Sequence, residues 1–142
     1  SLSIYYTGIL RNSYDLLKTQ DTKSKNMNKE MLYNLDKIKE MGLQTKNILE
    51  KGNLIDYGYL MNDHWNSKKK RSPKMTSKYI NYLYDYGLNN GAIGGKLIGA
   101  GGGGFLIFYC KNPKELELSF KKINIYKIDF NFDFDGAKTL SI

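Results

Sequence analysis

The feature that most constrains the fold of this chain is a run of six small residues: Gly99, Ala100, Gly101, Gly102, Gly103 and Gly104. Inside a helix or strand each glycine costs about 0.5–1 kcal/mol relative to alanine, so neither element is expected to run through this segment. The apolar stretches on both sides, residues 96–98 and 105–110, are typical of strands. We therefore expect two neighbouring strands that are joined by a glycine loop.

A glycine loop lets backbone N–H groups converge on anionic oxygens, which suits a phosphate. The alternative is that the glycines only connect two strands. Two known phosphate loops do not match the sequence. A Walker A loop would need glycine where Asn90 stands and Ser or Thr where Leu97 stands. Gly99, Gly101 and Gly104 match the spacing of a dinucleotide-binding loop, but that loop must open a helix and a strand is predicted here.

Helices are predicted along most of the chain before the loop, after a strand at residues 1–6 whose residues alternate. Apolar residues three or four positions apart indicate them. After a turn at Gly8 we expect a short helix to about residue 18. Further helices are expected from near Met31 to about 51, from 54 to near Pro73, and from about 77 to 89. Residues 20–28 are polar except for Met27 and are expected to form an exposed loop.

After the loop, the sequence predicts one more helix and a final strand. Asn112, Pro113 and Glu115 are typical of a helix start. Residues 128–134 alternate between apolar and polar, and Asp135-Gly136 signals a hairpin before residues 137–142. The predicted fold class is α+β: one domain over residues 1–142, with an antiparallel sheet and helices packed on the phenylalanine face of its last strand.

The net charge of +8 indicates an anionic partner, which could be a nucleic acid, a membrane surface or a phosphorylated metabolite. On one predicted helix His64 and Lys68 lie four residues apart, with Trp65 and Lys69 one step away, so these side chains could meet one ligand. The alternative is a solvated helix end, where cations are favourable. Acidic residues in the last strand argue against nucleic acid, because they would repel phosphates.

The lack of a long apolar run and the scarcity of cysteine and histidine restrict the location and the metal chemistry that can be expected. No apolar run comes near the length of about 18 residues that a membrane-spanning helix needs, so a soluble protein without a membrane partner is expected. Cys110 is the single cysteine and His64 the single histidine, so no protein-built metal site is indicated. A lone cysteine is ordinary in the cytoplasm, and we expect Cys110 to be buried. Because the chain begins at Ser1 rather than Met, we expect it to be a piece of a longer protein.

The segment from Lys96 to Gly104 resembles the third motif of the GHMP kinases, in residue order and in its strand-loop-strand setting. Residues 91–109 are most similar to the sugar-kinase branch, especially the D-glycero-D-manno-heptose 7-phosphate kinases. Further matches are Tyr6-Thr7-Gly8 with Arg11, His64-Trp65 with Lys68, and residues 132–136. The resemblance spans nearly the whole chain. It implies the ferredoxin-like C-terminal domain of these kinases, which has a four-stranded antiparallel sheet and a layer of helices.

The resemblance also implies a function. The chain would be the substrate-side half of a kinase that transfers phosphate from ATP to the anomeric hydroxyl of a heptose 7-phosphate or related sugar, for bacterial surface polysaccharides. Lys96 and residues 99–104 would form the phosphate or substrate loop; the candidates for holding the sugar phosphate are His64, Trp65, Lys68, Lys69 and Arg11. ATP and Mg²⁺ would be bound mainly by an N-terminal kinase half, and no residue here is assigned as catalytic.

Two expectations follow for the chain by itself. Without its N-terminal half it should be inactive, and the apolar surface where that half docks could also support a homodimer. The alternative function is a non-enzymatic α+β module that binds a metabolite or a nucleic acid, because this fold class alone implies no activity.

Overall fold

The computed structural model describes residues 1–10, 14–26, 29–136 and 138–139. Its centre is a four-stranded sheet in the order β2-β3-β1-β4, in which neighbouring strands are antiparallel. The strands are β1 (Leu2–Tyr6), β2 (Ala92–Leu97), β3 (Phe105–Cys110) and β4 (Lys127–Ile128). The two strands that flank the glycine loop are neighbours, as predicted, with Leu97 opposite Leu106.

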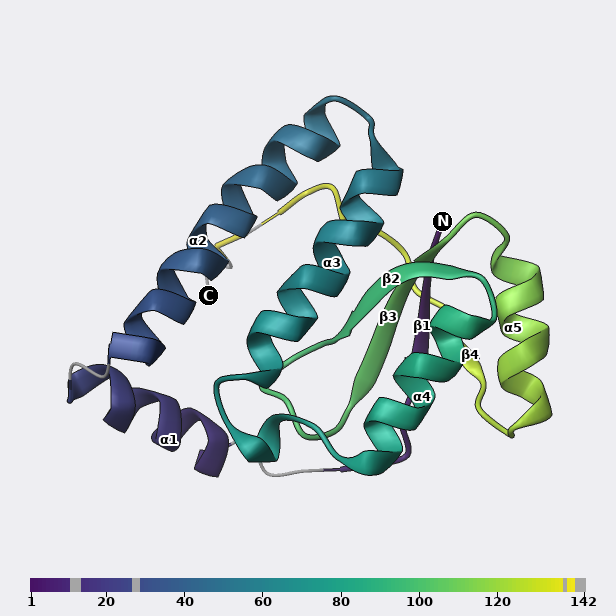
Figure 1. Ribbon diagram of the computed structural model, residues 1–142. Helices are drawn as coiled ribbons and strands as arrows, with labels where there is room; N and C mark the ends of the chain where they lie inside the picture. The colour runs from purple at the N-terminus through teal and green to yellow at the C-terminus, as the bar shows by residue number, and fades with distance from the viewer. Residues whose placement is uncertain (11–13, 27–28, 137, 140–142) are drawn as a thin grey trace.

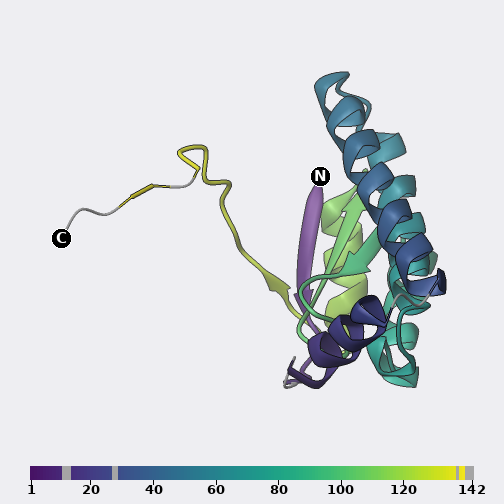
Figure 2. The ribbon, with the colours of Figure 1, turned by 90° about the vertical axis from the view of Figure 1, so that its left-hand side faces the viewer.

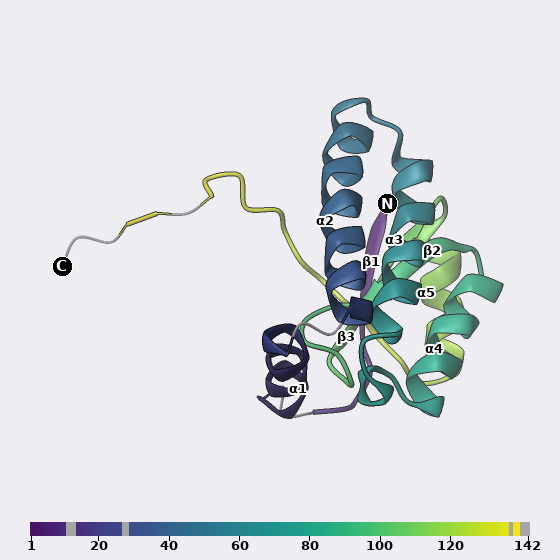
Figure 3. The same cartoon turned by 60° about the vertical axis from the view of Figure 1, so that its left-hand side comes forward.

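The helices surround this sheet unevenly (Figure 1). They are α1 (Tyr14–Lys25), α2 (Lys29–Glu50), α3 (Leu54–Lys69), α4 (Lys78–Asn89) and α5 (Pro113–Lys122), with a short 3₁₀ turn, η1 (Pro73–Met75). Figures 2 and 3 show α2 and α3 side by side on one side of the sheet, while the other side looks toward the C-terminal segment. The predicted α+β class with a helical layer is confirmed. None of the described helices is both long and apolar enough to cross a bilayer.

The core lies between the sheet and the helices α4 and α5. The Tyr5 ring of β1 stacks on Phe120 of α5 at 4.1 Å, and Phe108 of β3 stacks on Tyr84 of α4 at 5.7 Å. A Cβ atom at Gly87 would lie 2.6 Å from the Phe108 ring, so α4 can approach β3 closely only with glycine there. Cys110 is buried, as expected.

Helix α3 packs against the outer strand β2 at a contact between two glycines. A Cβ atom at Gly94 would lie 1.9 Å from the carbonyl oxygen of Gly58, so the two backbones touch without side chains between them. This contact holds α3 along β2. The C-terminal end of α3, which carries His64 and Lys68, consequently lies beside the start of the glycine loop.

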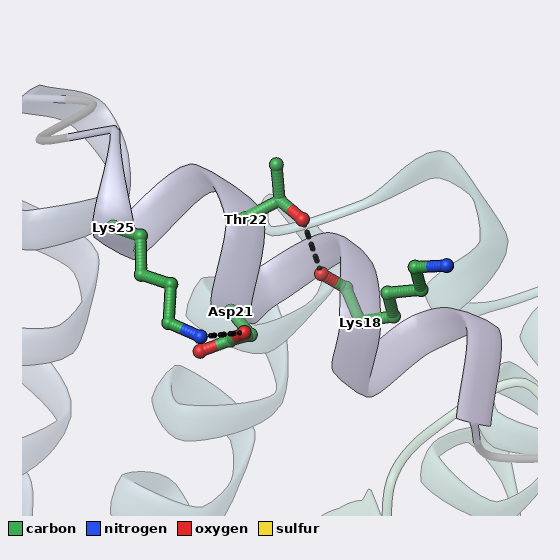
Figure 4. Close-up of polar contacts among 4 residues, drawn as sticks. All are labelled: Lys18, Asp21, Thr22 and Lys25. Carbon is green, nitrogen blue, oxygen red and sulfur yellow. Dashed lines mark hydrogen bonds and ion pairs between the residues drawn. The ribbon is translucent and has the colours of Figure 1, made fainter.

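The predicted loop at residues 20–28 is wrong over most of its length, because α1 continues to Lys25. Within α1 the Lys25 ammonium pairs with the Asp21 carboxylate at 2.7 Å, and the Thr22 hydroxyl donates to the Lys18 carbonyl at 2.9 Å (Figure 4). Contacts four residues apart can support a helix that has no apolar stripe. The apolar pattern alone therefore missed the part of α1 at residues 20–25. Residues 27 and 28 lie outside the described part.

The predicted final strand is also wrong in extent, because β4 includes only Lys127 and Ile128. Phe132 and Phe134 are 65% and 92% exposed, so no helix covers the phenylalanine face of this segment. The phenylalanines of the core are Phe108 and Phe120 instead. The alternation is suitable for a strand, but a strand also needs a neighbour to pair with. Of the predicted hairpin arm, residues 137 and 140–142 lie outside the described part.

Candidate functional site

The glycine loop is held in place by hydrogen bonds at both of its ends. Ile98 N–H donates to the Phe105 carbonyl at 2.8 Å, and Gly104 N–H donates to the Ile9 carbonyl at 3.0 Å. In the middle, Gly102 N–H donates to the carbonyl of Met75 in η1 at 2.8 Å. The loop is therefore a fixed part of the fold, and the N–H groups of Gly102 and Gly104 are already used within it.

Glycine is required in this loop for two separate reasons. Four of its residues have positive φ angles: Gly99 (82°), Gly101 (114°), Gly102 (75°) and Gly104 (96°). Two positions are also crowded, since a Cβ atom at Gly101 would lie 2.1 Å from Met75 Sδ and one at Gly103 would lie 2.8 Å from the Ile9 carbonyl oxygen. At Gly99 a Cβ would meet nothing within 4 Å. The open side of the loop thus begins at Gly99.

Lys68 connects α3 to the beginning of the loop. Its side chain is buried and its ammonium donates to the carbonyls of Leu97, at 3.2 Å, and Gly99. Two of its three N–H bonds are therefore directed at backbone oxygens. Lys68 holds the loop in position, and it also lines a cavity, where its third N–H has no acceptor among the described residues.

Around Lys68 the structure gathers further basic side chains, which we call the basic cluster: His64, Lys68, Arg71 and Lys96. The Lys96 ammonium lies 3.2 Å from Nδ1 of His64. Since an ammonium can only donate, Nδ1 accepts, and the proton of the neutral imidazole is assigned to Nε2. The Nε group of Arg71 donates to Asn34 Oδ1 at 3.0 Å, and this bond ties the end of α3 to α2.

The pKa values of the basic cluster show that its charges are crowded. The pKa of His64 is lowered to about 4, first by burial and then by the charges of Lys96, Lys68 and Arg71. The pKa of Lys68 is lowered to about 8, again by burial first and then by Arg71 and Lys96. Within the described part of the chain, no carboxylate forms an ion pair with any of the four. An anion would relieve both the repulsion and the loss of solvation.

A cavity of about 260 Å³ lies beside the basic cluster. It is lined by Leu17, Ile38, His64, Lys68, Arg71, Gly99 and Ala100. The cavity therefore combines three members of the basic cluster with the open side of the glycine loop. Its chemistry suits a phosphate or another compact anion.

The structure brings together only some of the predicted site residues. His64, Lys68 and Lys96 meet at the loop, but the Lys69 ammonium lies over the rings of Trp65 and Tyr84, at 5.6 and 5.8 Å. Trp65 is fully buried in the core. Trp65 and Lys69 therefore point away from the cavity, one step around the helix from His64 and Lys68. Arg11, the remaining candidate, lies outside the described residues.

Arg71 was not among the predicted site residues, although it lines the cavity. The signal was present in the spacing: positions 64, 68 and 71 follow each other by four and three, which puts them on one face of a helix. The prediction included Lys68 and Lys69 of this basic run but not Arg71. No group of three or more His, Cys, Asp or Glu residues that could hold a metal occurs in the part that the structure describes.

A second, larger cavity also borders the loop and shares Gly99 and Ala100 with the first. Its volume is about 650 Å³, and its walls include Tyr6, Ile98, Phe105 and Ile128 together with most of the loop glycines. Ile98, Phe105 and Ile128 are between 38% and 41% exposed. The loop therefore borders a basic cavity at α3 and an apolar cavity at the sheet.

Comparison with known proteins identifies relatives of this chain. The family model described as "GHMP kinases C terminal" matches residues 44–126. The chain is 28% identical, over 141 residues, to the D-glycero-alpha-D-manno-heptose 7-phosphate kinase of Campylobacter jejuni. It is 30% identical, over 116 residues, to the L-fucokinase/L-fucose-1-P guanylyltransferase of Bacteroides fragilis.

These matches cover much of this chain but only part of each relative. They include 98% of this chain and 41% of the heptose 7-phosphate kinase, and 78% of this chain and 12% of the bifunctional enzyme. Among solved structures, L. major mevalonate kinase in complex with R-mevalonate has the same fold, with a TM-score of 0.79 at 19% identity. That likeness covers 89% of this chain and 40% of the mevalonate kinase chain.

Proposed function

Because the chain belongs to the GHMP kinase family, as a C-terminal domain matched over residues 44–126, we propose that it is the substrate-side half of an ATP-dependent sugar kinase. In this proposal residues 1–142 form one domain that works with an N-terminal kinase half. That half binds most of the ATP and the Mg²⁺, which neutralises charge on the phosphates. The chain's relatives, of which it spans 41% or less, support the need for such a partner.

The observation that carries this proposal is the basic cluster with its cavity. A sugar phosphate has a dianionic group far from the hydroxyl that reacts, and that group needs cations or N–H donors to hold it. Lys68 and Arg71, which line the cavity, supply the cations, Lys96 adds its charge from beside His64, and neutral His64 supplies a further donor at Nε2. The substrate proposed from these features is a sugar that already carries one phosphate, such as a heptose 7-phosphate.

In the proposed reaction the anomeric hydroxyl oxygen attacks the γ-phosphorus of ATP. The bond from that phosphorus to the β–γ bridging oxygen breaks, ADP leaves, and the hydroxyl proton is lost to a base. The basic cluster takes no part in this bond exchange: it anchors the distant phosphate, and the fixed glycine loop keeps the sugar in position. Positioning of this kind accounts for much of the catalysis in phosphoryl transfer. We further propose that the enzyme works in the cytoplasm on precursors of bacterial surface polysaccharides.

The test is a charge substitution in the complete kinase that contains this chain. Lys96→Met removes a cluster charge, while Lys69→Met removes the same charge from a side chain that points away from the cavity. A lost charge-assisted bond of about 1.5–3 kcal/mol corresponds to an increase of roughly 10- to 150-fold in KM for the sugar phosphate. The KM for ATP should stay within about threefold for both variants.

Steady-state kinetics with heptose 7-phosphate and with unphosphorylated heptose would separate the outcomes. The effect of Lys96→Met should be confined to the phosphorylated sugar. If both lysine variants behave alike, or if the unphosphorylated sugar is affected equally, the basic cluster does not hold a substrate phosphate.

A further inference from the structure

The segment that follows β4 has the pattern of a strand but lies outside the sheet. We define the aromatic tail as residues 129–135, in which Phe130, Phe132 and Phe134 alternate with polar residues. The rings of Phe130 and Phe132 are 5.4 Å apart, and those of Phe132 and Phe134 are 6.2 Å apart. The phenylalanines therefore share one side of an extended segment, as they would in a strand. Phe132 and Phe134 are nevertheless 65% and 92% exposed.

Within the described residues, the tail does not pair with the chain's own sheet. β4 pairs with β1 through Ile128 opposite Ile4 and Lys127 opposite Tyr5. Continuing this register would put Asp129 opposite Ser3 and Phe130 opposite Leu2, but the pairing ends at Ile128 although β1 includes Leu2 and Ser3. Figure 2 shows the C-terminal segment running away from the sheet instead of along β1.

We propose that the aromatic tail is a β-strand that pairs with a sheet edge of the N-terminal kinase half. Its phenylalanine side would pack on that half, and its side with Asp129, Asp133 and Asp135 would face water. The inference rests on the proposed function, because it requires that half to exist. It goes further by naming the segment that joins the two halves.

Three observations favour this occupant over another partner. The chain spans 41% of the Campylobacter jejuni relative, so most of a kinase of that length lies outside this chain. The match to that relative covers 98% of this chain and so includes most of the aromatic tail, although the family-model match ends at residue 126. In addition, Ile128 at the root of the tail also lines the apolar cavity beside Tyr6 and Phe105. One partner could cover this cavity and pair with the tail.

Hydrogen exchange followed by mass spectrometry tests the proposal directly. In the complete kinase, the amides of residues 130–135 should exchange about a hundredfold more slowly than in this chain alone. Equally fast exchange in both proteins would overturn the proposal. Slow exchange in the chain alone would also overturn it. If that protection does not depend on protein concentration, the tail folds back on its own sheet. If the protection increases with concentration, the tail pairs with a second copy of the chain.

A pair of substitutions checks that packing of the phenylalanine side is the cause. Phe132→Ser should lower the melting temperature of the complete kinase and leave that of the chain alone unchanged, while Asp133→Ser should change neither by more than about 2 °C. An equal loss in the chain alone would contradict the proposal. Neither hydrogen exchange nor the melting temperature depends on turnover. If the tail is protected but Lys96→Met does not change the KM for the sugar phosphate, only the proposed function is refuted. An unprotected tail with the expected kinetics would refute only this inference.

Discussion

His64 is the residue whose environment gives the clearest dependence on pH. Burial and the neighbouring cations lower its pKa from 6.5 to about 4 in the folded protein, so the unfolded chain binds a proton more readily between these values. Stability from this group is therefore fully present above pH 6.5 and is lost as the pH falls toward 4. Neutral His64 is what the hydrogen bond from Lys96 requires.

We predict that His64→Gln removes part of the decrease in melting temperature between pH 6.5 and 4. Glutamine can still donate and accept but cannot become charged. The measurement is thermal unfolding of this chain at several pH values, with and without inorganic phosphate. Phosphate should stabilise the unsubstituted chain, because a ligand that binds the folded state and not the unfolded state raises the free energy of unfolding. Parallel pH curves for the two proteins would show that His64 is not the titrating group.

At the scale of the element, the glycine loop combines strain with close packing. Gly99 and Gly101 both have positive φ angles, yet a Cβ at Gly101 would strike Met75 Sδ and a Cβ at Gly99 would enter open space. The left-handed conformation costs any other residue about 1–2 kcal/mol at either position. A side chain at Gly101 would in addition have to displace Met75 of η1, whose carbonyl accepts the hydrogen bond from Gly102 N–H.

We predict that Gly101→Ala destabilises this chain by about 1–3 kcal/mol more than Gly99→Ala does. Denaturant unfolding of both variants would measure the difference. Gly99→Ala should mainly affect sugar-phosphate binding in the complete kinase, because Gly99 lines the cavity beside Lys68 and an added Cβ there would meet no atom of the fold. Equal destabilisation by the two alanines would mean that Met75 moves aside at little cost.

At the scale of the whole molecule, the loop has one basic and one apolar cavity beside it, and the apolar one is open at the sheet. We predict that this chain alone releases no ADP above background with ATP and a sugar phosphate. The proposed N-terminal half supplies the main site for ATP, and without it no γ-phosphate is held in line with the sugar hydroxyl. A coupled assay for ADP decides this. Turnover by the chain alone, abolished by Lys96→Met, would contradict the proposed division of labour.

Local pattern was enough to predict most elements of this protein. The glycine run predicted two paired strands, Asn112 caps α5 as its pattern predicted, and α4 has nearly the predicted bounds. These features depend on residues close together in the chain, so they can be recognised without the fold. The resemblance to GHMP kinases came from the same kind of local motif and is confirmed by the family match.

The sequence by itself determined that His64 and Lys68 share a helix face, because helical spacing is local. Only the tertiary structure decided which face turns toward the loop. The Gly58–Gly94 contact lays α3 along β2, so that Lys68 reaches Gly99 while Trp65 enters the core with Lys69 beside it. It likewise decided that the aromatic tail, despite its strand pattern, pairs with no other strand in the part of the chain that the structure describes. Both outcomes depend on contacts between residues far apart in the sequence, which no local spacing contains.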